Sequence, residues 1–98
     1  MKVLGKDILE QFYKKHSDSK SALIAWHRDA CDSSWSCPQD IKNRYRSTDF
    51  ISNNRVIFNI KGNNYRLVIK VRCQNGILVV LWIGTHAEYD KKDFRSKK

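Results

Sequence analysis

The chain has 98 residues, of which 41% are hydrophobic and 30% charged, with one proline and four glycines. This composition fits one globular domain over residues 1–98 and excludes fibrous and disordered chains. No apolar run approaches the roughly 20 residues of a membrane-spanning helix. Residues 1–7 also lack the apolar stretch of a signal peptide, so we expect a cytoplasmic protein without membrane contact.

The positive charge is concentrated in the second half of the chain. Lys and Arg number 19 against 10 acidic residues, a net charge of +9. Residues 1–49 hold nine basic and seven acidic side chains, and residues 50–98 hold ten and three, so the net charge rises from +2 to +7. This distribution favours a nucleic-acid partner over a basic surface that serves only solubility.

Cysteines and histidines are scattered along the chain: Cys31, Cys37, Cys73, His16, His27 and His86. An odd number of cysteines without a CxxC pair predicts free thiols, and Cys73 is expected to be packed inside a strand. A metal site would need histidine partners at short spacing, and these histidines are scattered, so we expect neither a metal nor a cofactor.

The first half of the chain predicts helices. Apolar residues at helical spacing indicate one helix over 7–15 and a second over 19–32. Residues 33–37 are expected to form a loop, and Pro38 to occupy the first turn of a short third helix that reaches about Tyr45. Residues 47–54 are polar and are expected to be irregular. The charged tail 91–98 is expected to fray.

The second half predicts three antiparallel strands over 56–61, 64–73 and 77–85, because these segments are rich in β-branched residues. The dipeptides Gly62-Asn63 and Asn75-Gly76, which favour two-residue hairpin turns, separate them. The fold class is therefore α+β, with two N-terminal helices and a short third packed on a small antiparallel meander.

Two-residue turns would also fix the register of these strands. The predicted pairs are Ile60 with Tyr65, Phe58 with Leu67, Val56 with Ile69, Ile69 with Trp82, and Val71 with Val80.

The opposite face of the predicted middle strand is basic. It carries Arg66, Val68, Lys70 and Arg72, flanked by Asn59 and Lys61 on the first strand. A merely solvated face is the alternative, since antiparallel sheets often have one. Solvated faces usually mix signs, and no acidic residue occurs between Arg55 and Thr85, so we favour a surface that follows a nucleic-acid backbone.

Residues 84–90 follow the third strand and contain His86, Tyr89 and Asp90. Histidine moves protons near neutral pH, and nearby cations could stabilise the phosphorane of RNA self-cleavage without a metal. The alternatives are that His86 packs against Trp82 or caps a backbone group, that Asp90 pairs with Lys91 or Arg95, and that Tyr89 is ordinary core.

Two stretches of the second half carry a resemblance: Asn54-Arg55-Val56-Ile57-Phe58-Asn59-Ile60-Lys61-Gly62-Asn63-Asn64-Tyr65-Arg66-Leu67-Val68 and Ile83-Gly84-Thr85-His86-Ala87-Glu88-Tyr89-Asp90-Lys91. Both closely resemble the HigB family of toxins from type II toxin–antitoxin systems. The resemblance extends to Ala25-Trp26, Trp35, residues 38–42 and Asp49-Phe50, and so spans nearly the whole chain.

The resemblance implies a RelE-like fold and ribosome-dependent endoribonuclease cleavage of mRNA. It further implies a helix-turn-helix antitoxin of the HigA type, through which alone the toxin would meet operator DNA. The implied catalytic residues are His86, Tyr89, Lys61, Arg66 and Asp90. In this assignment His86 acts as general acid or base, and Lys61 and Arg66 stabilise the phosphorane. Tyr89 positions a base by stacking or contacts the phosphate. The implied RNA-binding residues are Asn59, Lys70, Arg72 and Lys91.

Two other functions stay open at this point. One is a non-catalytic module that occupies RNA or the ribosome, and the other is an antitoxin-binding protein that acts in repression of its operon. One departure from the resemblance bears on them, because many relatives carry Arg where this chain has Leu81. In the predicted register Leu81 would lie opposite Lys70, so a phosphate ligand would be missing there.

Overall fold

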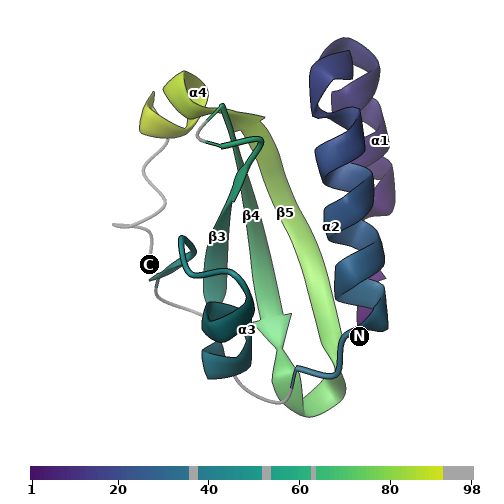
Figure 1. Ribbon diagram of the computed structural model, residues 1–98, viewed down its shortest axis with the longest axis vertical. Coiled ribbons are helices and arrows are strands. Elements are labelled where there is room, and N and C mark those ends of the chain that lie inside the picture. The colour runs from purple at the N-terminus through teal and green to yellow at the C-terminus, as the bar shows by residue number, and fades with distance from the viewer. Residues whose placement is uncertain (36–37, 52–53, 63, 92–98) are drawn as a thin grey trace.

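The computed structural model describes residues 1–35, 38–51, 54–62 and 64–91. A central sheet has helices on its two sides (Figure 1), so the predicted α+β class is confirmed. The helices are α1 (Lys6–Lys15), α2 (Lys20–Asp32), α3 (Pro38–Arg44) and α4 (His86–Lys91), and the strands are β1 (Lys2–Leu4), β2 (Asp49–Ile51), β3 (Arg55–Ile60), β4 (Tyr65–Arg72) and β5 (Ile77–Thr85). None of the described helices is long and apolar enough to cross a membrane.

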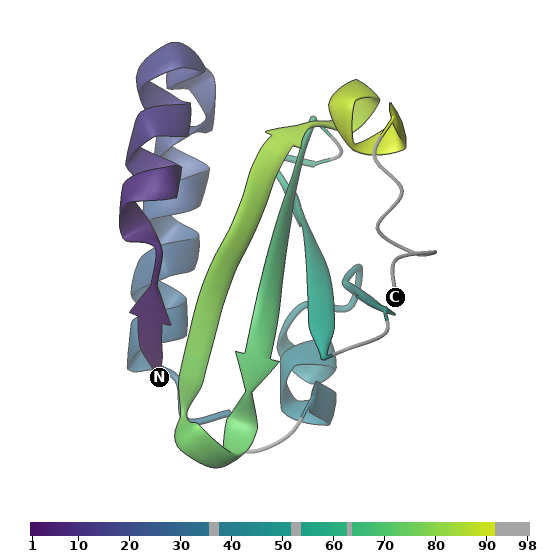
Figure 2. The same ribbon diagram turned by 180° about the vertical axis from the view of Figure 1, so that it is seen from behind.

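The sheet has five strands in the order β1-β5-β4-β3-β2. The predicted antiparallel meander is its centre, formed by β3, β4 and β5. The prediction missed the two flanking strands. Strand β1 pairs parallel to β5, beside which it lies in Figure 2, and β2 pairs antiparallel to β3. The expectation that residues 47–54 are irregular is wrong at β2, because three residues are too few to show an alternating pattern.

The predicted register is confirmed on one side of β4 and wrong on the other. Between β3 and β4, Ile60 pairs with Tyr65 and Val56 with Ile69, as expected. Between β4 and β5, Ile69 pairs with Val80 instead of Trp82. The cause is a 3-10 turn, η2 (Cys73–Asn75), which lengthens the connection beyond two residues. Cys73 therefore begins this turn and does not lie inside a strand.

A bulge in β5 brings the pairing with β4 beyond it closer to the predicted register. The register changes between Val68 and Ile69, so that Val68 pairs with Trp82 while Ile69 pairs with Val80. Leu81 is the extra residue and does not lie opposite Lys70, which pairs with Val79. Because side chains alternate along a strand, the bulge places Trp82 on the face of Val68 and Ile83 on the opposite face.

The larger core lies between one face of the sheet and the first three helices. It contains Leu9 of α1, Leu23 and Trp26 of α2, and Ile41 of α3, packed against the sheet around Phe58. The apolar stripes that predicted these helices are the ones buried here. Helix α1 is joined to β1 at Gly5, whose positive φ of 94° and close approach to Val80 both require a residue without a side chain.

The other face of the sheet is only partly open. Ile57 and Val68 are buried there in a small cluster with Tyr89 of α4, and Ile51 and Trp82 pack against it. Arg55 is also buried, with 9% of its surface exposed. The expected basic face is therefore covered at one end by α4, a helix that was not predicted from the sequence.

Candidate active site

Helix α4 follows β5 directly, and its first turn is held by two reciprocal hydrogen bonds. The backbone N–H of Glu88 donates to Thr85 Oγ1 at 3.1 Å, and the backbone N–H of Thr85 donates to Glu88 Oε1 at 2.9 Å. This capping box satisfies N–H groups that the start of a helix leaves without partners. The backbone N–H of His86 donates to the Asn64 carbonyl at 3.2 Å. The start of α4 is thus fixed against the β3–β4 turn.

Both ring nitrogens of His86 face charged side chains. Arg66 Nη2 lies 2.9 Å from Nε2, and Asp90 Oδ2 lies 3.2 Å from Nδ1. A guanidinium can only donate, so Nε2 accepts through its lone pair and the proton of the neutral ring is on Nδ1, from which it is donated to Asp90. The His86 side chain remains 41% exposed. These contacts define a triad of Arg66, His86 and Asp90.

The side chain of Arg66 lies over the ring of Tyr89. Its guanidinium carbon lies 4.9 Å from the centre of the Tyr89 ring, a cation–π contact. The rings of Tyr89 and Trp82 are 6.2 Å apart at 47°. Arg66 Nε is buried and has no hydrogen-bond partner in the described residues. The Tyr89 ring therefore holds the guanidinium beside His86 while one of its donors is unsatisfied.

Gly84 makes room for Trp82 beside α4. It pairs with Arg66 across the two strands. A Cβ atom at position 84 would lie 2.4 Å from Cζ2 of Trp82 and 2.8 Å from Glu88 Oε1. The indole therefore lies across the backbone of β5, in space that any side chain at position 84 would fill.

The predicted RNA-binding residues of the sheet lie at increasing distance from the triad. Asn59 pairs directly with Arg66, and its Nδ2 donates to the Ser47 carbonyl at 3.2 Å. Lys70 and Arg72 are four and six residues beyond Arg66 on β4, which corresponds to about 13 and 20 Å of extended strand. At those distances they can reach other phosphates of a bound strand but not the phosphate at Arg66.

Lys61 stands apart from the triad, on the helix-covered side of the sheet. Its Nζ lies 3.5 Å from Asp18 Oδ2 in the 3-10 turn η1 (Ser17–Ser19). The Tyr65 hydroxyl donates to the same carboxylate at 2.5 Å. This hydrogen bond, followed by the charge of Lys61, lowers the pKa of Asp18, and it raises the pKa of the Tyr65 hydroxyl. The structure thus brings together four of the five predicted catalytic residues and places Lys61 with a different partner.

The sequence reasoning missed two contributors to the site. Trp82 was expected in the main core, and only the bulge at Leu81 moves it to the α4 face. The capping box had a readable signal, because Thr85-His86-Ala87-Glu88 has threonine followed three residues later by glutamate. That motif predicts a helix that starts at His86, and a helix places His86 and Asp90 on one face, since residues four apart are neighbours there.

The arrangement can bind a phosphate and move a proton at the same place. Arg66 supplies fixed donors for an oxyanion, and the imidazole beside it has one nitrogen that can take a proton. Within the described residues, no group of three His, Cys, Asp or Glu side chains could hold a metal ion.

Comparison with known proteins gives two matches. The family model HigB_toxin, described as the RelE-like toxic component of a toxin–antitoxin system, matches residues 19–92. A curated relative, "mRNA interferase HigB" of Escherichia coli O6:H1 (strain CFT073), is 26% identical over 93 residues, which cover 93% of this chain and 90% of the relative.

Proposed function

This chain belongs to the HigB family of RelE-like toxins, and on that premise we propose that it is a ribosome-dependent endoribonuclease that cleaves mRNA without a metal. The observation that carries the proposal is the contact between Arg66 Nη2 and His86 Nε2 at 2.9 Å, because it joins a phosphate ligand to a proton acceptor. The relative named as an mRNA interferase supports the same substrate.

In this proposal the bound phosphate frees the histidine. Without substrate, Arg66 donates a hydrogen bond to the lone pair of His86 Nε2, which the histidine needs in order to accept a proton. When an RNA phosphate enters, the guanidinium turns its donors to the non-bridging oxygens, since charge-assisted bonds to phosphate are stronger than a bond to neutral imidazole. His86 Nε2 is then available only when substrate is in place.

The cleavage step follows from that geometry. His86 Nε2 takes the proton of the 2′-hydroxyl, and the 2′-oxygen attacks the adjacent phosphorus. Arg66 stabilises the negative charge of the phosphorane. The bond to the 5′-oxygen breaks, and the proton on His86 passes to that oxygen, which leaves a 2′,3′-cyclic phosphate and a 5′-hydroxyl. The imidazole returns to its neutral form.

The two neighbours of this pair act as positioning residues. Asp90 accepts the proton of Nδ1 and so keeps Nε2 as the basic nitrogen of the ring. Tyr89 is 7% exposed, and its ring lies against the guanidinium of Arg66, so we assign it to holding Arg66 rather than to stacking on a base.

The remaining cations are proposed to bind RNA on either side of the cut. Lys70 and Arg72 continue along β4, and Asn59 lies beside Arg66. Lys91 ends α4. Lys61 would reach a neighbouring phosphate on release from Asp18, since both side chains of that ion pair are about half exposed, 45% and 50%.

The proposal includes partners and location. A HigA-type helix-turn-helix antitoxin would neutralise the toxin and would be its only link to operator DNA. The ribosome would present the mRNA, and the protein would act in the cytoplasm.

The test is a reconstituted cleavage assay. Purified toxin is mixed with ribosomes stalled on a defined mRNA, and the RNA ends are mapped by primer extension. We expect cuts in the decoding-site codon that need ribosomes, and a rate about 10²–10⁴-fold lower for His86→Ala. His27→Ala is the matched control, because His27 lies on α2, which packs on the opposite face of the sheet from α4. Equal cleavage by the His86→Ala protein would contradict the assignment.

A second candidate is a non-catalytic module that stalls ribosomes by occupancy. It is favoured by the same contact, because a histidine held at Nε2 by Arg66 is not yet a base. Intact mRNA together with salt-sensitive ribosome binding, weakened by Arg66→Ala and not by His86→Ala, would support it.

A further inference from the structure

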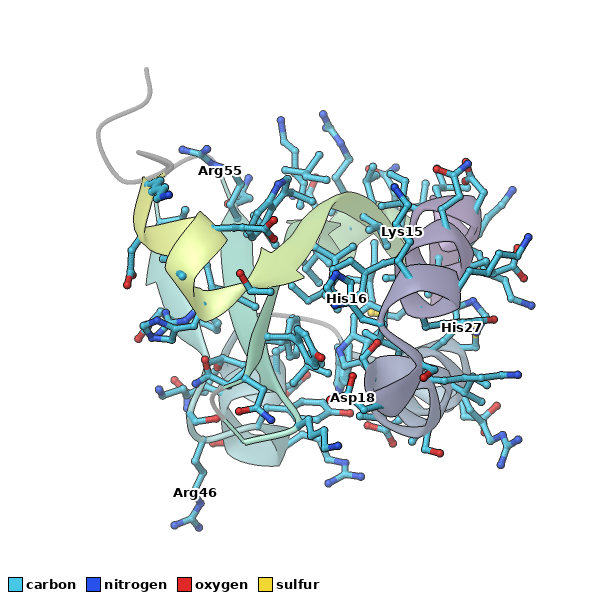
Figure 3. All side chains as sticks on the ribbon, turned by 90° about the horizontal axis from the view of Figure 1, so that it is seen from above. Lys15, His16, Asp18, His27, Arg46 and Arg55 are labelled. Carbon is cyan, nitrogen blue, oxygen red and sulfur yellow. The ribbon has the colours of Figure 1, made fainter. Side chains whose placement is uncertain are left out.

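A groove next to the triad has no role in the reaction described above. It has a volume of about 420 Å³ and lies between the end of α1 and the α4 side of β5. Phe12, Lys15 and His16 line it from the α1 side, and Trp82, Glu88 and Lys91 from the other. Figure 3 looks down on this end of the molecule and shows Lys15 and His16 where α1 faces β5. Trp82 connects the groove to the triad through its contact with the Tyr89 ring.

The aromatic walls of the groove are fixed before anything binds. On the α1 side the rings of Phe12 and His16 are stacked, with centroids 4.4 Å apart and planes at 21°. On the other side the Trp82 indole lies across Gly84, and Tyr89 packs against it. Aromatic side chains that are held in place stack nucleobases at little entropic cost.

The charged side chains that line the groove are two lysines and one glutamate, so its net charge is positive. Lys15 and Lys91 are exposed, and their ammonium groups make no ion pair in the described part of the chain. The single acidic residue, Glu88, directs its carboxylate to the backbone N–H of Thr85 at 2.9 Å. Two free cations and aromatic rings fit a nucleotide, whose phosphate and base match them, better than an acidic peptide, which has no flat base to stack.

We propose that this groove binds the nucleotide that adjoins the scissile phosphate, with its base against Trp82 and the His16–Phe12 pair and its phosphate between Lys15 and Lys91. The proposal rests on the proposed function, since it takes the triad as the place of cleavage. It assigns to Trp82 and Lys15 a role in binding RNA that is separate from proton transfer.

The experiment measures binding, not cleavage. Hexauridylate analogues with 2′-deoxy sugars, which cannot be cut, each carry one abasic residue at a different position. Their affinities for the toxin, freed from its antitoxin, are measured by fluorescence anisotropy at low salt. For the unchanged protein we expect one abasic position to weaken binding by about tenfold or more, the usual loss of one stacked base. In Trp82→Ala that penalty is expected to disappear at the same position only, and Trp82→Phe is expected to restore most of it.

Lys15→Ala keeps the proposal testable if the tryptophan variant does not fold. It should lower the magnitude of the salt slope of log K by about 0.7, the value for one phosphate contact of a single strand. Lys2→Ala is the matched control, because it removes the same charge from β1, outside this groove.

Several outcomes would overturn the inference. They are no measurable binding of the oligonucleotides, abasic penalties that are the same in the Trp82→Ala protein, and equal effects of Lys15→Ala and Lys2→Ala. Binding of a polyglutamate peptide that is lost with Lys15→Ala, while RNA binding is kept, would show a protein-docking surface instead. A position-specific penalty without any cleavage on ribosomes would support the groove and contradict the proposed function, so the two can fail separately.

Discussion

Replacing Gly84 with alanine tests whether the site depends on the position of the Trp82 indole. The new Cβ would lie 2.4 Å from Cζ2 and 2.5 Å from Cη2 of Trp82, whereas ordinary contacts begin at 3.4 Å, so the ring must retreat by at least 1.0 Å. The indole packs against the cluster of Ile57, Val68 and Tyr89 on one side and lines the groove on the other. Because the indole contacts the Tyr89 ring, and Arg66 lies over that ring, a shift of the indole displaces the support of Arg66.

The expected size of the effect follows from two opposing terms. Overpacking of a closed site costs about 1–3 kcal/mol. Alanine restricts the unfolded chain more than glycine and returns about 0.4–1 kcal/mol, and the φ angle of Gly84 is not in the left-handed region. We therefore expect Gly84→Ala to lower the free energy of unfolding by about 1–2 kcal/mol, with Tm lower by about 4–8 °C for each kcal/mol.

Urea denaturation of a double-mutant cycle measures this effect. Trp82→Ala removes the ring that the new Cβ would strike and leaves only the contact with Glu88 Oε1, the end of a flexible side chain, so Gly84→Ala should cost less in a Trp82→Ala background. A loss of stability in Gly84→Ala that is the same with and without Trp82 would refute the reasoning. So would full stability together with an unchanged cleavage rate, since the indole would then not be confined.

Three further predictions concern the triad, the cap of α4 and the Asp18 pair. Arg66→Lys should lower cleavage at least tenfold while the salt dependence of ribosome binding stays the same, because lysine keeps the charge but cannot contact His86 and a phosphate as a fork. Thr85→Ala should cost about 1 kcal/mol in urea denaturation through the lost cap, and Thr85→Ser should restore it. Asp18→Asn should be less stable than the unchanged protein at neutral pH; because the Tyr65 hydrogen bond holds the pKa of Asp18 below its ordinary value of 3.8, this difference should shrink as the pH falls below that value. A stability difference that grows in acid would contradict the last of these.

The elements that could be predicted are those with a long repeating pattern. The apolar stripes around Leu9 and Leu23 indicated α1 and α2, and the alternation in β3 and β4 gave both strands and their register. Beside this hairpin turn Ile60 pairs with Tyr65, as expected. His86, Tyr89 and Asp90 could be grouped from the sequence because they lie within five residues of one another directly after the third predicted strand.

The remaining features depend on contacts that no local pattern contains. Strands β1 and β2 have three residues each and are defined by their pairing with β5 and β3. The turn η2 breaks the two-residue hairpin that Asn75-Gly76 indicated. Lys61 was grouped with the basic face because it follows Asn59 by two residues, but the strand ends at Ile60 and the chain turns there with a φ of 52° at Lys61.

The extra residue at position 81 divides β5 into two parts of opposite phase. Below it, Leu78 and Val80 face the main core, and above it the inward position passes to Ile83 while Trp82 and Gly84 turn to α4. An arginine at position 81 would therefore have no partner across the sheet, and its presence or absence says little about phosphate binding at Lys70. Deleting this one residue would leave Val80 paired with Ile69 and Trp82 with Val68, so the strand would lose its bulge while the indole kept its place against Tyr89. Pairing Leu81 within the ladder would instead turn the indole inward. The bulge thus holds position 81 out of the ladder, and the residues above it take the faces of their partners on β4, Ile83 in the main core and Trp82 and Gly84 toward α4.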